Sequence, residues 1–118
     1  YEEKIPMDRV TMSSDANGCM SVTLPDGSQK QLAVDPDSFH DEVQAAILLG
    51  VPLEIVTRVV STNPAQANGL YPQKGCLRVD SDADFIIYDD DYAIATVVAK
   101  GKVMVQDGQV LVKGTFER

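Results

Sequence analysis

The sequence predicts an α/β segment followed by an all-β segment, and three observations support this prediction. Apolar residues recur at helical spacing over 35–69, whereas from position 75 onward they alternate with polar residues. Ahead of the helical stretch, a short apolar run over 9–13 ends in a polar turn that carries an acid, Asp15. A strand, an acidic turn and helices together make one β/α unit. We therefore expect two parts, residues 1–70 and residues 71–118.

A strand and a hairpin are expected first. Residues 9–13 are typical of a short buried strand, and the turn Asp15-Ala16-Asn17-Gly18 places Asp15 at the carboxyl end of that strand. Alternating residues flank Pro25-Asp26-Gly27, which is a strong turn signal. We expect a hairpin or a structured loop there, with Met20, Val22 and Leu24 before the turn and Leu32 and Val34 after it.

Three helices are expected next. Asp35 is a suitable N-cap, Pro36 suits the first helical position, and the apolar face of the first helix ends at Gly50. Pro52 starts a second amphipathic stretch, and Pro64 follows a further cap residue. The helices are predicted to run from Asp35 to Gly50, from Pro52 through the stripe of Leu53, Val56 and Val60, and from a cap at Thr62 or Asn63 to Gly69.

The final third is predicted to be a β-meander. Segment 70–75 separates helical from strand-like periodicity and is the expected boundary between the two parts. Asp107-Gly108 is a preferred pair for a two-residue hairpin, and Lys100-Gly101-Lys102 marks another turn. The expected strands are 85–88, 94–99, 103–105 and 110–112.

Composition narrows the classes of partner. Eighteen acidic and ten basic residues give a net charge of −8, which disfavours nucleic acid and anionic membranes because both bind through Lys and Arg. No apolar run is long enough to span a bilayer, and the first residues lack a signal-peptide pattern. Two distant cysteines, Cys19 and Cys76, make no disulfide framework. We expect a soluble, cytoplasmic protein with reduced thiols.

Asp15 is the leading candidate for chemistry. A carboxylate just past a strand can bind a metal, orient a water or act as a general base, and α/β barrels keep their catalytic groups at strand carboxyl ends. Asp-x-Asn-Gly is also ordinary turn chemistry, so the spacing alone leaves a purely structural role open. Cys19 follows four residues later and could face the same pocket, although a buried structural thiol is the commoner role.

The other polar clusters favour structural roles. Asp80 to Asp84 imitates the start of a calcium loop, but the glycine at loop position six is missing, so Asp84 is expected to bond backbone amides at a strand entry. Asp89-Asp90-Asp91 is expected to be a solvated loop. His40, the single histidine, is expected at the surface, and no catalytic triad, P-loop or Gly-x-Gly-x-x-Gly motif is present.

Five short motifs stand out along the chain: Ser13-Ser14-Asp15-Ala16-Asn17-Gly18, Thr62-Asn63-Pro64-Ala65, Lys74-Gly75-Cys76-Leu77, Asp82-Ala83-Asp84 and Val112-Lys113-Gly114-Thr115-Phe116-Glu117. Together they resemble the C-terminal part of the amidohydrolase superfamily and, within it, the isoaspartyl dipeptidase (β-aspartyl peptidase) family. The resemblance covers nearly the whole chain. The first and last motifs are the most specific to that family.

The resemblance implies a fold and a site. The fold would be α/β plus β, the last β/α unit of a metal-dependent (β/α)8 barrel followed by the C-terminal strands of a small β-sandwich. Two zinc ions hold a bridging hydroxide in that family, and Asp15 matches the aspartate on its last barrel strand. Asp15 would then bind one metal and serve as the catalytic proton acceptor and donor. Cys19 stands where the family has a serine that helps hold the substrate, and Ala16 stands where a glycine is common.

The resemblance also implies what this chain lacks. A complete barrel of this type takes about 250 residues, and the histidines and the carboxylated lysine that complete the metal site would lie outside this chain. We expect the isolated chain to bind little or no zinc and to be inactive. The full-length enzyme would cleave small β-aspartyl dipeptides and form a homo-oligomer.

Two alternatives stay open at this point. The first is another amidohydrolase, acting on a cyclic amide or an acylated amino acid. The second is a non-catalytic β-rich module for assembly or binding, in which Asp15 is only a turn residue.

Overall fold

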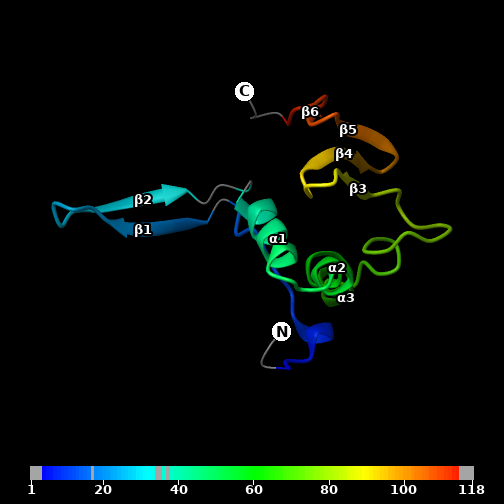
Figure 1. The fold of residues 1–118 in the computed structure, drawn as a ribbon, viewed down its shortest axis with the longest axis horizontal. Coiled ribbons are helices and arrows are strands. Elements are labelled where there is room, and N and C mark those ends of the chain that lie inside the picture. The colour runs from blue at the N-terminus through cyan, green and yellow to red at the C-terminus, as the bar shows by residue number, and fades with distance from the viewer. Residues whose placement is uncertain (1–3, 17, 34–35, 37, 115–118) are drawn as a thin grey trace.

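The computed structural model describes residues 4–16, 18–33, 36 and 38–114. A projecting hairpin comes first, a group of helices follows, and a four-stranded sheet ends the described chain (Figure 1). The molecule measures 56 × 41 × 32 Å and has a radius of gyration of 16.6 Å. A compact domain of this length would have a radius of gyration of about 13.5 Å. The chain is therefore more extended than a single closed globule.

The hairpin prediction is confirmed. Strands β1 (Cys19–Thr23) and β2 (Gln29–Ala33) pair antiparallel, with Met20 opposite Leu32. The Asp26 carboxylate accepts hydrogen bonds from the backbone N–H and the hydroxyl of Ser28, and these bonds hold the pKa of Asp26 below its usual range. The turn chemistry read from the sequence therefore closes this hairpin.

Helix α1 (Ser38–Leu48) confirms the first predicted helix. The Phe39 N–H donates to the Pro36 carbonyl at 3.1 Å, and the helix ends before Gly50, whose φ of 91° suits glycine. The predicted N-cap, Asp35, lies outside the described residues. Val43 is the buried residue of this helix.

The second and third predicted helices form one continuous helix, so the predicted break at Thr62 or Asn63 is wrong. Helix α2 (Leu53–Thr57) runs into a π-helical turn, η2 (Arg58–Thr62), and then into α3 (Asn63–Ala67). Thr62 and Asn63 both have right-handed helical backbone angles, and neither side chain caps a helix. Both side chains instead bond segments that are distant in sequence, which a local capping pattern does not reveal.

The predicted strand over 9–13 is not formed. Residues Met7–Arg9 make a single 3₁₀ turn, η1, and the described residues that follow it up to Asp15 belong to no helix or strand. Val10 has extended backbone angles, φ −99° and ψ 134°. A strand also needs a neighbour that completes its hydrogen-bond ladder, and the described chain offers none to this segment.

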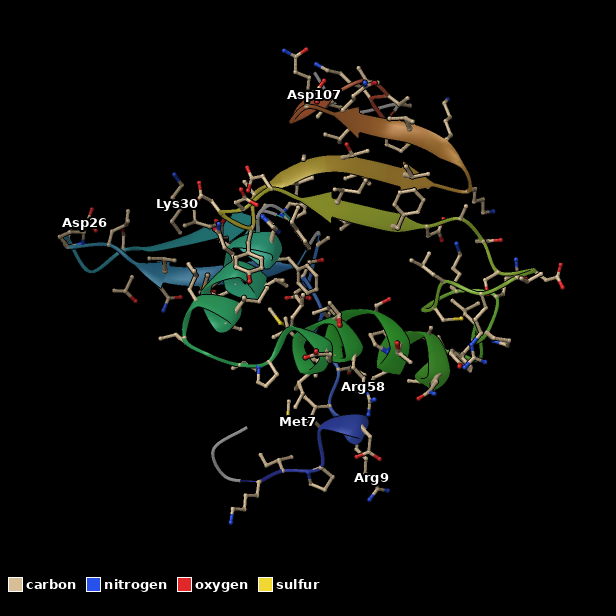
Figure 2. All side chains as sticks on the ribbon, turned by 45° about the vertical axis from the view of Figure 1, so that its right-hand side comes forward. Met7, Arg9, Asp26, Lys30, Arg58 and Asp107 are labelled. Atoms are coloured by element: carbon tan, nitrogen blue, oxygen red, sulfur yellow. The ribbon has the colours of Figure 1, made fainter. Side chains whose placement is uncertain are left out.

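The long helix anchors this N-terminal segment instead. The side-chain amide of Asn63 donates to the carbonyl oxygens of Met7 at 2.7 Å and of Val10 at 2.6 Å. The Met12 N–H donates to the Val59 carbonyl oxygen at 3.3 Å. Figure 2 shows Met7 and Arg58 where η1 meets the π-helical turn. These three hydrogen bonds hold the N-terminal segment in place of the strand pairing that a β-strand would have made.

The linker after the helix packs back onto it. Thr62 Oγ1 donates to the Gly75 carbonyl oxygen at 2.8 Å. Gly75 has a φ of 79°, and a Cβ atom there would lie 2.6 Å from the Ala65 Cβ. Only glycine therefore permits this close approach. The boundary that we placed at 70–75 remains a prediction.

One lysine links the linker to the start of the sheet. Lys74 Nζ lies 2.8 Å from Asp82 Oδ2 and 2.5 Å from Asp84 Oδ2. Asp82 also accepts a hydrogen bond from the Gln73 side chain, and Asp84 accepts one from the Lys100 N–H at 2.6 Å. The strand-entry role predicted for Asp84 is confirmed.

The C-terminal meander is confirmed, but the strand expected over 110–112 is wrong in its bounds and covers 109–110. The N–H groups of Leu111 and Val112 both donate to the Met104 carbonyl oxygen and do not extend the ladder. Strands β3 to β6 pair in sequence order, and every pair is antiparallel. Lys100-Gly101 and Asp107-Gly108 have positive φ at both residues, as two-residue hairpin turns of the type I′ class require. The bounds are β3 (Phe85–Tyr88), β4 (Ile94–Ala99), β5 (Lys102–Gln106) and β6 (Gln109–Val110).

His40 has a more specific role than the surface position expected from the sequence. Its ring stacks on Tyr88, with ring centroids 5.6 Å apart and planes 12° from parallel. Gln44, one turn further along α1, donates from its side chain to the Asp91 carbonyl oxygen at 2.8 Å. Burial raises the pKa of Tyr88. Helix α1 thus contacts β3 through this ring pair and the loop between β3 and β4 through this hydrogen bond.

The described part of the chain buries few apolar side chains. The buried ones are Val43, Val56, Val59, Ala65 and Val98, whereas Leu49 and Val79 are 86% and 92% exposed. No helix among the described residues has the length and apolar character needed to cross a membrane.

Replacing Gly75 with alanine should destabilise the protein more than the same change at Gly101. Both glycines have positive φ, but only at Gly75 would a Cβ meet Ala65 and the Ser61 carbonyl. We expect Gly75→Ala to lower the free energy of unfolding by about 2–4 kcal/mol, and Gly101→Ala by about 1–2 kcal/mol. Urea denaturation would measure both, and equal losses would contradict the close packing of the linker.

The Lys74 cluster predicts a dependence of stability on pH. Hydrogen bonding to Lys74 holds the pKa of both Asp82 and Asp84 below their usual range, with Gln73 and the Lys100 N–H as further causes. A carboxylate with a lowered folded-state pKa stabilises the fold above its unfolded pKa, near 3.8, and loses that contribution as the pH falls through the folded pKa. Between pH 6 and pH 2.5, Asp84→Asn should therefore lose less stability than the wild type.

The exposed loop variant Asp90→Asn is the control, and its acid response should match that of the wild type. Denaturation midpoints at both pH values test this prediction. If Asp84→Asn and the wild type responded identically to acid, the carboxylate would contribute nothing to the fold.

Candidate functional site

Asp15 lies in a tight, exposed turn. Its φ is 49°, a left-handed conformation that aspartate tolerates better than most residues. The Asp15 N–H donates to Ser13 Oγ at 3.2 Å, and the Gly18 N–H donates to the Asp15 carbonyl oxygen at 2.7 Å. The Ala16 N–H donates likewise to Ser14 Oγ at 3.3 Å. The two serines and Gly18 therefore shape the turn that presents the Asp15 carboxylate.

Gly18 leaves room for that carboxylate. A Cβ atom at position 18 would lie 2.6 Å from Asp15 Cγ and 2.8 Å from the Asp15 carbonyl oxygen, and it would also overlap Oδ2. No side chain larger than hydrogen fits there unless Asp15 moves. Because Asn17 lies outside the described residues, the turn is defined by its two ends, Asp15 and Gly18.

A hollow of about 380 Å³ lies beside the segment that leads to Asp15. It is lined by residues 11–14, by Phe39 of α1, by Pro64 and Ala67 of α3 and by Asn68, which follows α3. Neither Asp15 nor Cys19 lines this hollow. The segment before Asp15 therefore borders the same hollow as α1 and α3.

Cys19 begins β1 and is exposed. It pairs with Ala33 in the hairpin register. Asp15 and Cys19 therefore stand at the two ends of one short connection, with Asp15 at the end of the N-terminal segment and Cys19 at the first position of the hairpin. The structure does not bring the thiol into the hollow beside the N-terminal segment.

The described residues do not form a metal site by themselves. They contain no group of three or more His, Cys, Asp or Glu side chains that could hold a metal ion. A zinc site normally takes three or four such ligands from the protein, and Asp15 offers one carboxylate. His40 packs on Tyr88, and the Cys76 thiol lies 3.4 Å from Ser81 Oγ and 3.3 Å from the Pro72 carbonyl oxygen. The described residues therefore offer no complete set of zinc ligands.

The other acidic residues have structural contacts. Asp89 accepts hydrogen bonds from the N–H groups of Asp91 and Ala93, at 3.0 and 2.8 Å, and Asp89, Asp90 and Asp91 are all exposed. This agrees with the solvated loop expected from the sequence.

Nothing in the sequence indicated that Asn63 is a buried, hydrogen-bonded residue. Its two partners, the carbonyl groups of Val10 and Met7, are 53 and 56 residues away, so no local pattern reveals them.

Comparison with known proteins identifies the family. The model of the "Amidohydrolase family" matches residues 4–104. Among curated proteins, an allantoinase from Deinococcus radiodurans is 55% identical over 38 residues, which are 32% of this chain and 8% of that enzyme. An L-hydantoinase from Paenarthrobacter aurescens is 51% identical over 39 residues, which are 33% of this chain and 8% of that enzyme.

Two solved structures resemble most of the chain. A β-aspartyl dipeptidase from Fervidobacterium islandicum AW-1, in complex with a β-Asp-Leu dipeptide, has a TM-score of 0.77 and 28% identity over 94% of this chain and 30% of that one. An N-acetylglucosamine-6-phosphate deacetylase from Thermotoga maritima has a TM-score of 0.64 over 86% of this chain and 32% of that one, and at 18% identity it shows the fold alone.

The chain thus spans no more than about a third of either solved structure, and each curated match covers 8% of the enzyme's length. The family model matches well over half of the residues, including the Asp15 turn, the long helix, strands β3 and β4 and the first part of β5. The chain belongs to the amidohydrolase family.

Proposed function

We propose that this chain is the C-terminal part of a metal-dependent hydrolase that cleaves the isopeptide bond of β-aspartyl dipeptides. The observation that supports this most strongly is the similarity to the β-aspartyl dipeptidase of F. islandicum, which extends over 94% of the chain at a TM-score of 0.77. In this proposal, residues 1–70 complete a (β/α)8 barrel and residues 71–118 complete a small β-sandwich. The whole enzyme is a cytoplasmic homo-oligomer, and its partner is a small dipeptide.

Asp15 is the proposed catalytic residue and one metal ligand. Its exposed carboxylate is held by a turn that tolerates no side chain at position 18, so its position is well defined. A carboxylate so placed can accept the proton of the attacking water and return it to the departing amine. The proposed cofactor is zinc, with two ions in the complete enzyme and the other ligands supplied from outside this chain.

Cys19 is the proposed substrate-binding residue. It is exposed at the start of β1, four positions beyond Asp15. A thiol is a weak hydrogen-bond donor, so we expect Cys19 to influence substrate preference more than catalytic rate.

A cyclic amide is the second candidate substrate. The local identity of 55% to an allantoinase and of 51% to an L-hydantoinase, over 38 and 39 residues, favours it. Those matches cover about a third of this chain, whereas the dipeptidase similarity covers nearly all of it. The dipeptide therefore stays the first choice.

Replacing Asp15 with asparagine in the full-length protein should abolish most of the hydrolysis of β-Asp-Leu. Asparagine keeps the shape of the turn but removes the base, so we expect kcat/KM to fall about 10²–10⁴-fold. Asp8→Asn, an exposed acid in η1, is the matched control and should leave the rate unchanged. Hydantoin assayed in parallel separates the two candidate substrates. Full activity in Asp15→Asn would remove Asp15 from the mechanism.

Replacing Gly18 with alanine should lower activity through Asp15. The new Cβ would overlap the carboxylate, and a displacement near 1 Å at a catalytic group can cost about 10²-fold in rate. Gly27→Ala is the control, because position 27 is at the hairpin tip and has open space around it. Steady-state kinetics on both variants test this, and a Gly18→Ala enzyme as fast as Gly27→Ala would show that the contact is unimportant.

A further inference from the structure

We propose that Asn63 is a positioning residue for Asp15, acting through the backbone of the segment that leads to the catalytic turn. This inference rests on the proposed function of Asp15 as the catalytic carboxylate. Asn63 lies on the helix that binds this segment, and its side-chain hydrogen bonds go to the backbone of Met7 and Val10. Its role would be to fix where the Asp15 turn begins.

The amide of Asn63 is buried and shared between two carbonyl groups. Asn63 is 4% exposed and is the buried polar side chain found among the described residues. Its Nδ2 donates to the carbonyl oxygen of Met7 at 2.7 Å and to that of Val10 at 2.6 Å. One planar amide therefore fixes the positions of the Met7 and Val10 carbonyl groups relative to each other and to the helix.

The π-helical turn before Asn63 adds a third point of attachment. In the turn Arg58–Thr62, the Val59 carbonyl oxygen accepts the Met12 N–H at 3.3 Å. π-Helical turns are rare and occur frequently at functional sites. Figure 2 shows Met7 beside Arg58 at the start of this contact. The helix thus holds residues 7, 10 and 12, and the last of these is three positions before Asp15.

Hydrogen bonds to the helix tie described residues 7, 10 and 12 to a part of the chain that is distant in sequence. No described strand pairs with residues 10–15, and the Asp15 turn itself is closed by bonds between residues 13 and 18. Removing the Asn63 amide would leave two carbonyl groups without their donor, and the segment could then shift along the helix. A catalytic group is sensitive to such a shift, because a misplacement near 1 Å from a distant mutation can cost about 10²-fold in rate.

Thr62 offers a matched control. It is the neighbouring residue on the same helix, and its Oγ1 donates to the Gly75 carbonyl oxygen at 2.8 Å in a similarly part-buried setting. That bond joins the helix to the linker that leads to the sheet, and it does not involve the N-terminal segment. Thr62→Val therefore removes one helix-to-loop hydrogen bond without loosening the approach to Asp15.

The experiment compares Asn63→Ala, the milder Asn63→Ser and Thr62→Val in the full-length protein, at a temperature where circular dichroism shows all of them folded. With β-Asp-Leu as substrate, we expect Asn63→Ala to lower kcat about 10–100-fold while KM changes less than about 3-fold. Asn63→Ser, which keeps one donor, should show a smaller loss of kcat. Thr62→Val should leave kcat within about 3-fold of the wild type.

A substrate-independent measurement separates this inference from the proposed function. Amide hydrogen exchange at Met12 and Asp15 should be at least about 10-fold faster in Asn63→Ala than in the wild type, and unchanged in Thr62→Val. Exchange that is unchanged in Asn63→Ala, or equal kcat losses in Asn63→Ala and Thr62→Val, would overturn the positioning role. A wild type that hydrolyses no β-Asp-Leu would instead refute the proposed substrate, and the exchange rates would still decide the anchoring.

Discussion

The buried amide of Asn63 joins the N-terminal segment to the long helix, and the hydrogen bond from the Met12 N–H to the Val59 carbonyl oxygen supports the same junction. Its helix also carries Thr62 and Ala65, against which the linker packs at Gly75. The same helix therefore holds the approach to Asp15 on one side and the route to the sheet on the other. Because buried amides must be bonded, changes at Asn63 affect more than local helix stability.

The elements that the sequence predicted correctly are those whose causes are local. Asp26 and Ser28 close the first hairpin, and Asp107-Gly108 closes the last, each through bonds or backbone angles within a few residues. The strand over 9–13 failed as a prediction, because a strand depends on partners that periodicity cannot supply. The break at Asn63 failed for a related reason, since an asparagine before proline resembles a cap unless its distant partners are known.

The sequence predicted the central residue of the candidate site, Asp15, but not the contacts that hold the segment leading to it. Asp15 stands out in the sequence as an acid in a Ser-Ser-Asp-x-Asn-Gly turn, and the structure adds that Gly18 makes room for its carboxylate. The anchoring by Asn63 and Val59 and the stacking of His40 on Tyr88 appear only once the chain is folded. The family match then gives this turn a chemical context that its geometry alone does not provide.

The order of the sheet has a consequence for how the molecule folds. Strands β3 to β6 pair only with their neighbours in sequence, and the turns at Lys100-Gly101 and Asp107-Gly108 close short loops at little cost in chain entropy. The bonds from Asn63 to Met7 and Val10 close loops of 56 and 53 residues instead. Closing loops of that length costs more chain entropy than closing the two-residue turns of the sheet. The sheet should therefore assemble early, and the Asp15 turn should reach its final place only when the helix captures the N-terminal segment.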